Sequence, residues 1–272
     1  VSDIDAIGRL SAQGDISVSL HHAEGDPDNT VRFRLLCKGR KVALSNVLPL
    51  LEDFGMHVEG ERPYRITDGA RDTVWVHEFE LTYPSDITLD IARVEPLLAE
   101  AFTQVWLGHA ESDRFNRLVL SASCDWRIAA VMRAYARYMK QLRLGLSGIY
   151  IADTLAKHTA LSQLLMQYFE KKFSVKTGVN DRLSRQPVLD DIHDKIIEQL
   201  EAVDNLTEDK IIRHYLTLME ATLRTNVYQL DASQLPKAYF SFKFNVNAIP
   251  EAPKPKPAFE IFVYSPRVEG VH

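Results

Sequence analysis

The chain of 272 residues has few side chains that could do chemistry, and their spacing does not join them into one site. His21 and His22 are neighbours in an extended stretch, where successive side chains point to opposite faces, so they cannot easily chelate one metal ion together. His77 stands on an apolar face and is interpreted as a hydrogen-bonded core residue. Cys37 and Cys124 are far apart, which is typical of small core residues in a reducing compartment. The sequence contains no GxGxxG turn for a dinucleotide, and we expect no catalytic, cofactor-binding or metal-binding residue in it.

One turn is a candidate binding site for a small anionic effector. Residues 37–41 precede a predicted helix, and the first turn of a helix offers backbone N–H groups to an anion. A plain surface turn explains the same residues, and both interpretations stay open. The candidate effector-binding residues are Gly39, Arg40, Ser45 and Asn46.

Residues 1–112 are predicted to form an α+β domain. Four stretches alternate apolar with polar side chains, which is typical of an antiparallel sheet that is solvated on one face. Two apolar stripes with helical spacing lie between and after these stretches. The predicted strands are near 16–20, 31–37, 58–66 and 74–83, and the predicted helices are near 46–54 and 94–106.

The order of these elements predicts an ACT-like or ferredoxin-like sandwich. The order strand, strand, helix, strand, strand, helix leaves both helices free to cover one face of an antiparallel sheet. The strand that would close a βαββαβ unit is not visible after Trp106, and we expect the strand near 16–20 to take its place. Val74 and Val76 are expected on the polar, solvated face of the sheet.

Residues 113–235 are predicted to form a helical domain around the segment 126–144. This segment has apolar residues on most sides of its axis, so several neighbours must bury it. Arg133, Arg137 and Lys140 share one of its faces and predict a basic edge. A later helix carries an acidic stripe, which either pairs with this edge or is solvated by itself. The stripe consists of Asp190, Asp194, Glu198 and Glu201.

The last helix of this domain is predicted to run from Thr207 to Leu223. Thr207 is a suitable N-cap, because its hydroxyl can accept a hydrogen bond from the first turn. Glu208 and Asp209 add negative charge in that turn, where the helix dipole favours it. The apolar stripe of the helix continues through Leu223.

Residues 236–272 are expected to be the first strands of a truncated domain. The alternating phenylalanines of 239–244 predict one strand. Residues 259–264 are apolar on both faces, which is typical of a strand that is covered on both sides. The free edges of such a strand recruit a partner, so we expect it to pair with 239–244 in the same chain or, failing that, between chains.

Charge and hydropathy argue against two classes of partner. The net charge of -5 argues against general affinity for nucleic acid, although the basic edge keeps a local nucleic-acid site as a further hypothesis. No apolar run approaches the roughly 20 residues of a membrane span, and the sequence shows no signal-peptide pattern. We therefore expect neither nucleic acid nor a membrane as a partner.

Six segments of the chain carry a family resemblance when they are taken in order. They are DRFNRLVL, RAYARYMKQ, YIADTLAKH, EATLRTNVYQ, SFKF and FEIFVYSPRVEGVH. In this order they resemble the very large bacterial NAD-dependent glutamate dehydrogenases. Residues 1–112 resemble the family's third ACT-like domain, 113–235 its helical motif region, and 236–272 the start of its catalytic domain. SASCDW at 121–126 and Val227 depart from the family pattern, at positions that carry no chemistry.

The resemblance implies a parent enzyme that oxidatively deaminates L-glutamate to 2-oxoglutarate and ammonia and passes a hydride to NAD. The family's catalytic lysines and dinucleotide turn are expected beyond His272, so NAD belongs to the parent enzyme and none is expected on this segment. The segment is expected to be regulatory and architectural, and to contact its own catalytic domain and the other subunits of a cytoplasmic homo-oligomer. The alternative function is that of an ACT-like module that binds an amino-acid effector.

Overall fold

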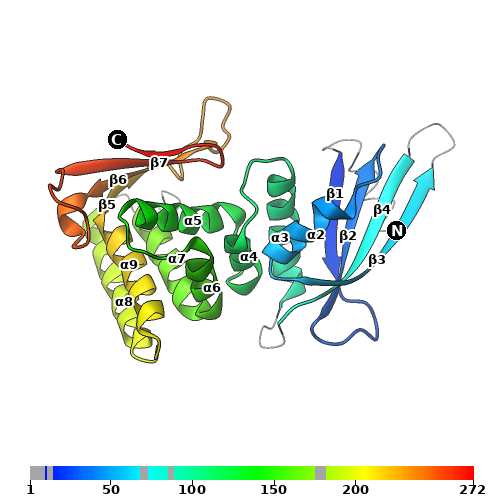
Figure 1. The fold of residues 1–272 in the computed structure, drawn as a ribbon, viewed down its shortest axis with the longest axis horizontal. Helices are drawn as coiled ribbons and strands as arrows, with labels where there is room; N and C mark the ends of the chain where they lie inside the picture. Colours follow the sequence, from blue (N-terminus) through cyan, green and yellow to red (C-terminus); the bar gives the residue numbers. More distant parts are fainter. Residues whose placement is uncertain (1–9, 11–14, 68–72, 85–88, 175–181) are drawn as a thin grey trace. The chain divides into compact units, whose positions relative to one another are not determined.

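The computed structural model shows two compact units, Val1–Trp126 and Arg127–His272 (Figure 1). Within the residues that the structure describes, each unit contains a four-stranded antiparallel sheet together with helices. The described residues are 10, 15–67, 73–84, 89–174 and 182–272.

The first unit is built on a sheet with the strand order β1-β2-β4-β3. Its strands are β1 (Ile16–His21), β2 (Thr30–Lys38), β3 (His57–Thr67) and β4 (Thr73–Thr82). Its helices are α2 (Leu44–Asp53), α3 (Ile91–Trp106), the 3-10 helix η1 (Arg114–Asn116) and α4 (Arg117–Ser121). The predicted ACT-like or ferredoxin-like fold class is confirmed. As expected, β1 pairs antiparallel with β2 and so takes the place of the closing strand.

The core of the first unit lies between the sheet and the helices α2 and α3. Phe33 of β2 packs against Phe102 of α3, with 5.0 Å between the ring centroids. Phe102 also stacks on Phe54, which follows the last residue of α2. Gly55 then turns the chain with a φ of +85°, a left-handed conformation that glycine adopts without strain. Both helices therefore pack on the same face of the sheet.

The opposite face of this sheet is only partly polar. At one end Arg32 donates to Glu80 across the strands, with 2.6 Å between Nη1 and Oε2. At the other end lies a buried apolar cluster of Leu10, Leu36, Val74 and Val76. The prediction that Val74 and Val76 are solvated is therefore wrong, because Leu10, which is distant in sequence, joins them in one cluster.

The second unit places a layer of helices against one face of its sheet (Figure 1). The strand order of this sheet is β5-β6-β7-β8. The strands are β5 (Thr222–Thr225), β6 (Phe240–Asn245), β7 (Phe259–Tyr264) and β8 (Glu269–Val271). The helices are α5 (Trp126–Gln141), α6 (Gly148–Lys157), α7 (Thr159–Phe173), α8 (Arg182–Leu200) and α9 (Leu206–Ala221).

The two predicted C-terminal strands form and pair within the chain. Phe240 of β6 lies opposite Tyr264 of β7, and Phe242 lies opposite Phe262. The predicted pairing is therefore confirmed. The sequence did not predict β5 and β8, which extend the sheet on its two sides.

The predicted end of the last helix is wrong. α9 ends at Ala221, and Thr222 begins β5 instead of continuing the apolar stripe to Leu223. Thr222 is buried and lies opposite Phe244 of β6, while its hydroxyl donates to the carbonyl oxygen of Leu218 at 2.7 Å. Pairing with β6 therefore ends the helix before its apolar pattern does.

Candidate functional site

The candidate effector residues lie on the connection between β2 and α2. Gly39 and Arg40 follow β2, while Ser45 and Asn46 belong to the first turn of α2, and all four are exposed. The N-cap residue is Ala43, whose side chain cannot accept a hydrogen bond from that turn. A helix that starts in this way can present its first backbone N–H groups to an anion.

Two contacts connect this turn to β4. Gly39 has a φ of +80°, and its N–H donates to the carbonyl oxygen of Thr73 at 2.8 Å. The Lys41 ammonium lies 5.8 Å from the ring centroid of Trp75, within the range of a cation–π contact. This turn therefore places an ammonium group near an uncapped helix start, and among the residues described here it contains no group that is activated for catalysis.

The histidine of the first sheet is a core residue, as the sequence indicated. His77 is buried, and its Nδ1 lies 2.8 Å from Oε1 of Glu61 on the neighbouring strand β3. Its Nε2 is buried among the described residues without a hydrogen-bond partner. A buried ring nitrogen without a partner costs free energy, which offsets part of what the hydrogen bond with Glu61 contributes.

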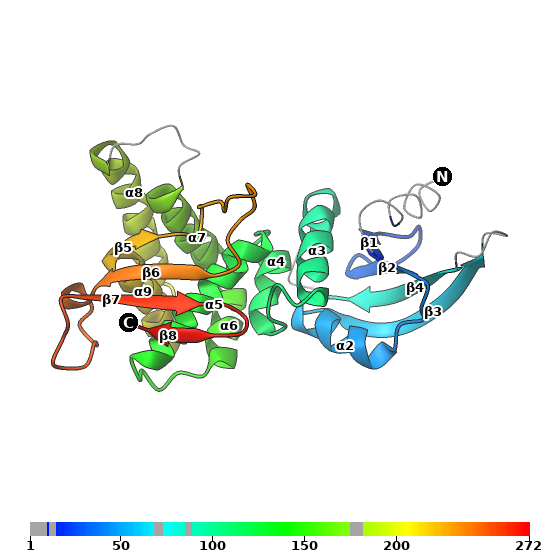
Figure 2. The same cartoon turned by 90° about the horizontal axis from the view of Figure 1, so that it is seen from above.

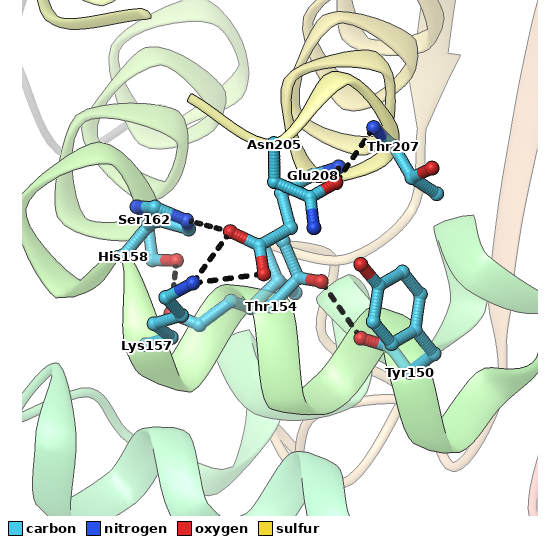
Figure 3. A network of polar contacts seen from close by, with 9 residues as sticks. Tyr150, Thr154, Lys157, His158, Ser162, Asn205, Thr207 and Glu208 are labelled. Atoms are coloured by element: carbon cyan, nitrogen blue, oxygen red, sulfur yellow. Dashed lines mark hydrogen bonds and ion pairs between the residues drawn. The ribbon is translucent and has the colours of Figure 1, made fainter. Parts of the chain in front are cut away.

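A buried carboxylate joins three helix ends in the second unit (Figure 3). Glu208, in the first turn of α9, accepts from Lys157, whose Nζ lies 2.9 Å from each carboxylate oxygen. His158, between α6 and α7, places its Nε2 2.6 Å from the same carboxylate. The hydrogen bond with His158 is the main cause that lowers the pKa of Glu208 below its ordinary value. Because both oxygens are engaged, we interpret Glu208 as a structural anion and not as a reacting base.

The residues just before Glu208 show how α9 begins. The N-cap is Asn205, whose Oδ1 accepts from the backbone N–H groups of Thr207 and Glu208 at 2.9 and 3.2 Å (Figure 3). The prediction that Thr207 caps the helix is therefore wrong by two residues. Both residue types are good N-caps, so the sequence alone did not distinguish them. The acidic first turn with Glu208 and Asp209 is present as predicted.

Two tyrosines of α5 form the centre of the aromatic core of the second unit. Tyr135 is buried, and its hydroxyl donates to Oγ1 of Thr222 at 2.9 Å. Tyr138 stacks on Phe244 of β6, with 4.2 Å between ring centroids, and donates to Oε1 of Glu260 at 2.7 Å. Burial raises the pKa of both phenols, so they stay protonated and anchor the packing. The expectation that several neighbours bury this helix is confirmed.

The basic edge predicted on α5 is not a continuous exposed surface. Arg133 is only 1% exposed, and Nε of Arg137 lies 3.8 Å from Oε2 of Glu269 on β8. Lys140 alone of the three predicted residues is fully at the surface. Binding to nucleic acid depends on exposed cations that reach phosphates, so this geometry argues against such a site. The helix with the acidic stripe, α8, packs against α7, and its pairing with the basic edge stays a prediction.

Two negative findings apply to the part of the chain that the structure describes. No three His, Cys, Asp or Glu side chains there are grouped so that they could bind a metal ion. No helix in the same ranges has the length and the apolar character needed to cross a membrane. Cys37 and Cys124 are both buried and are not joined in a disulfide, and the thiol of Cys124 donates to the carbonyl oxygen of Leu118.

Three family models match successive parts of the chain. The model described as "Glutamate dehydrogenase, ACT3 domain" matches residues 15–94. The model "Glutamate dehydrogenase, helical motif 3" matches residues 110–175. The model "Bacterial NAD-glutamate dehydrogenase, catalytic domain" matches residues 195–272. The three matches follow the order that the resemblance of the sequence implies.

Curated relatives with the name NAD-specific glutamate dehydrogenase align over the whole chain. The relative from Pseudomonas aeruginosa is 43% identical over 279 residues, that from Halomonas elongata 38% over 274, and that from Mycobacterium tuberculosis 34% over 282. The alignments cover 100% of the chain but 17%, 16% and 17% of the relatives, so the chain spans about a sixth of their length. The chain therefore belongs, as a segment, to the family of the bacterial NAD-specific glutamate dehydrogenases.

Proposed function

We propose that the chain is a non-catalytic, regulatory and architectural segment of an NAD-dependent glutamate dehydrogenase. The parent enzyme would convert L-glutamate, NAD and water to 2-oxoglutarate, ammonia and NADH in glutamate catabolism. The observation that supports the architectural role is the shared core of the second unit. There α5, in the part that matches helical motif 3, packs through Tyr135 and Tyr138 against β6, in the part that matches the catalytic domain.

The chain by itself is expected to show no glutamate-dependent reduction of NAD and no saturable binding of NAD. The reason is that its sequence lacks a GxGxxG turn, the motif that holds a pyrophosphate at a helix N-terminus in dinucleotide-binding domains. NADH absorbance measures the activity, and titration calorimetry measures the binding. The full-length enzyme that contains the chain is the positive control and is expected to reduce NAD. Micromolar NAD binding by residues 1–272 alone would overturn the proposal of a non-catalytic segment.

The second candidate function is that of an amino-acid effector module. It is favoured by the match to an ACT3 domain and by the exposed, uncapped start of α2. In this proposal, backbone N–H groups at the start of α2 and the side chains of Arg40 and Asn46 would together hold the carboxylate of the effector, beside Gly39 and Ser45.

If this second function holds, Arg40→Ala and Asn46→Ala are expected to weaken the binding of an amino acid about tenfold each, since each removes one polar contact. Titration calorimetry of the full-length enzyme with a panel of L-amino acids measures the affinity. Arg62→Ala, at an exposed position of β3, is the matched control and is expected to bind as the wild type does. No heat of binding from any amino acid would exclude this function.

The proposal also includes the domain division and the partners. We infer that 1–112, 113–235 and 236–272 are an ACT-like domain, a helical domain and the first strands of a catalytic domain. We further infer that NAD binds elsewhere in the parent enzyme, and that the parent is a cytoplasmic homo-oligomer. The matches to three consecutive parts of one enzyme family support this organisation.

A further inference from the structure

One face of the second sheet carries no helix among the residues that the structure describes, and its central strand β7 presents apolar side chains there. The side chains of β7 alternate between the two faces. Phe262 and Tyr264 point toward the helices and are 0% and 2% exposed, whereas Phe259 and Ile261 point the other way and are 54% and 37% exposed. Figures 1 and 2 show the helices of this unit on one side of the sheet. We name the row of Phe259, Ile261 and Val263 the open stripe.

The residues beside the open stripe are small, polar or cationic. Val263 has Ser241 and Gly270 beside it on the neighbouring strands. Ile261 lies opposite Lys243, whose Nζ is 4.4 Å from the ring centroid of Phe259. Lys243 in turn lies opposite Arg224 of β5, so two cations stand together on one side of the stripe. Asn245 lies opposite Phe259, and His272 lies opposite Ile261 on the other side. The face is thus a narrow apolar stripe between small or polar residues, with positive charge on the β5 side.

We propose that a helix of the same polypeptide, from outside residues 1–272, packs lengthwise on the open stripe. This inference rests on the proposed function, in which the chain is part of a longer enzyme. A central strand that is apolar on both faces is typical of a sheet covered on both faces. The aligned segment is only 17% of the length of the relative from Pseudomonas aeruginosa. An enzyme of that length has ample further chain from which such a helix can come.

The dimensions of the stripe fit one helix. From Phe259 to Val263 the strand advances about 13 Å, at roughly 3.3 Å per residue. A helix covers that length with about nine residues, which present two or three apolar side chains on one face. Carboxylates on the edge of this helix would face Lys243 and Arg224. The occupant is therefore an amphipathic helix with acidic residues along the side that faces β5.

A second copy of the chain fits this surface less well. Three partly exposed side chains offer roughly 200 Å² of apolar area. A stable interface between separate proteins buries about 800 Å² on each partner. A helix of the same polypeptide needs less area, because it is held near the sheet by the chain and loses little translational freedom when it packs.

Thiol labelling of Ile261→Cys tests the proposal in the full-length enzyme and in residues 1–272. The native cysteines of the segment are buried, so the new thiol is the reactive one on this face. The labelling rate at residue 261, followed by peptide mass spectrometry, is compared with the rate in the same protein unfolded by urea. We expect residue 261 to react at least tenfold more slowly in the folded full-length enzyme than in folded 1–272. Adding Lys243→Glu is expected to reverse part of this protection.

The outcomes distinguish a covering helix from an uncovered face and from a second copy of the chain. They also distinguish a failure of this proposal from a failure of the proposed function. Equal labelling of folded 1–272 and of the full-length enzyme overturns the proposal, and so does protection that disappears when the protein is diluted to monomers, which would indicate a second copy. Carbene footprinting of wild-type Phe259 and Ile261 gives the same readout without a substitution. Glutamate-dependent NAD reduction is measured on the same preparation. Full activity with an unprotected residue 261 refutes the covering helix alone, whereas lack of activity refutes the proposed function.

Discussion

The variant Tyr135→Asp is expected to leave the second unit unfolded at room temperature. Tyr135 is 1% exposed, so an aspartate at this position would be a buried carboxylate with no cation placed to pair with it in the described part of the chain. The variant also removes a ring from the centre of the aromatic core and the donor to Thr222. The rings that contact Tyr135 belong to Phe169, Tyr215, Phe242 and Phe244, at centroid distances of 6.1, 6.3, 5.1 and 6.2 Å.

The expected loss is as large as the stability of a typical domain. Removing a buried aromatic ring costs about 3–5 kcal/mol, and burying an unpaired charge costs several kcal/mol more. A domain of this size is stable by only about 5–15 kcal/mol. Thermal unfolding of residues 1–272, followed by circular dichroism, measures the effect. Helical signal that persists with the wild-type midpoint would show that Tyr135 is not in the core.

The matched control for this variant is Gln141→Asp, at an exposed position of the same helix. It introduces the same side chain near the C-terminal end of α5, where the helix dipole disfavours a negative charge by about 0.5 kcal/mol. The control is therefore expected to remain folded. A similar loss of structure in both variants would mean that the effect comes from helix propensity and not from burial.

The second large effect is expected from Glu208→Gln, which is predicted to destabilise the second unit by about 2 kcal/mol at neutral pH. The glutamine keeps the shape of the side chain but loses the charge that holds Lys157 and His158. In the folded state the pKa of Glu208 is lowered from its ordinary value of 4.5. Its contribution is therefore complete above that value and is lost as the pH falls through the lowered folded-state pKa.

Urea unfolding as a function of pH measures this prediction. The free energies of unfolding of the wild type and Glu208→Gln are expected to converge in acid, because protonated Glu208 carries no charge either. Glu198→Gln, at an exposed position of α8, is the control and is expected to stay within about 0.5 kcal/mol of the wild type. A difference between wild type and Glu208→Gln that does not shrink in acid would show that packing, and not the ion pair, holds the three helix ends together.

Sequence patterns predicted the elements of this protein better than their boundaries. The alternation of apolar and polar residues found β1, β2, β4 and β6, because each of these strands has one face on a core. The end of α9 was misplaced, because the helix ends where Thr222 pairs with β6, more than a dozen residues further along the chain. Such a pairing has no local signal in the sequence.

The side-chain environments were predictable only where they depend on neighbours in sequence. The exposed turn at Gly39 follows from its glycine and its flanking charges, and the structure places it at the surface. Arg133 was expected on a basic edge from its spacing, yet it is buried by elements that the spacing does not describe. The Glu208 cluster escaped detection because Lys157 and His158 are about fifty residues away from it in sequence. Only the three-dimensional fold brings these charges together.

The direct junction of α9 and β5 has a mechanical consequence. Ala221 ends the helix and Thr222 begins the strand, so no loop lies between them to absorb a displacement. The 16 residues of α9 make a stiff rod about 24 Å long. A displacement of Lys157 and His158 would therefore be transmitted along α9 and would move β5 together with its hydrogen-bonded neighbour β6. α9 is thus a stiff connection between the charge cluster of Glu208 and the edge strand β5 of the sheet.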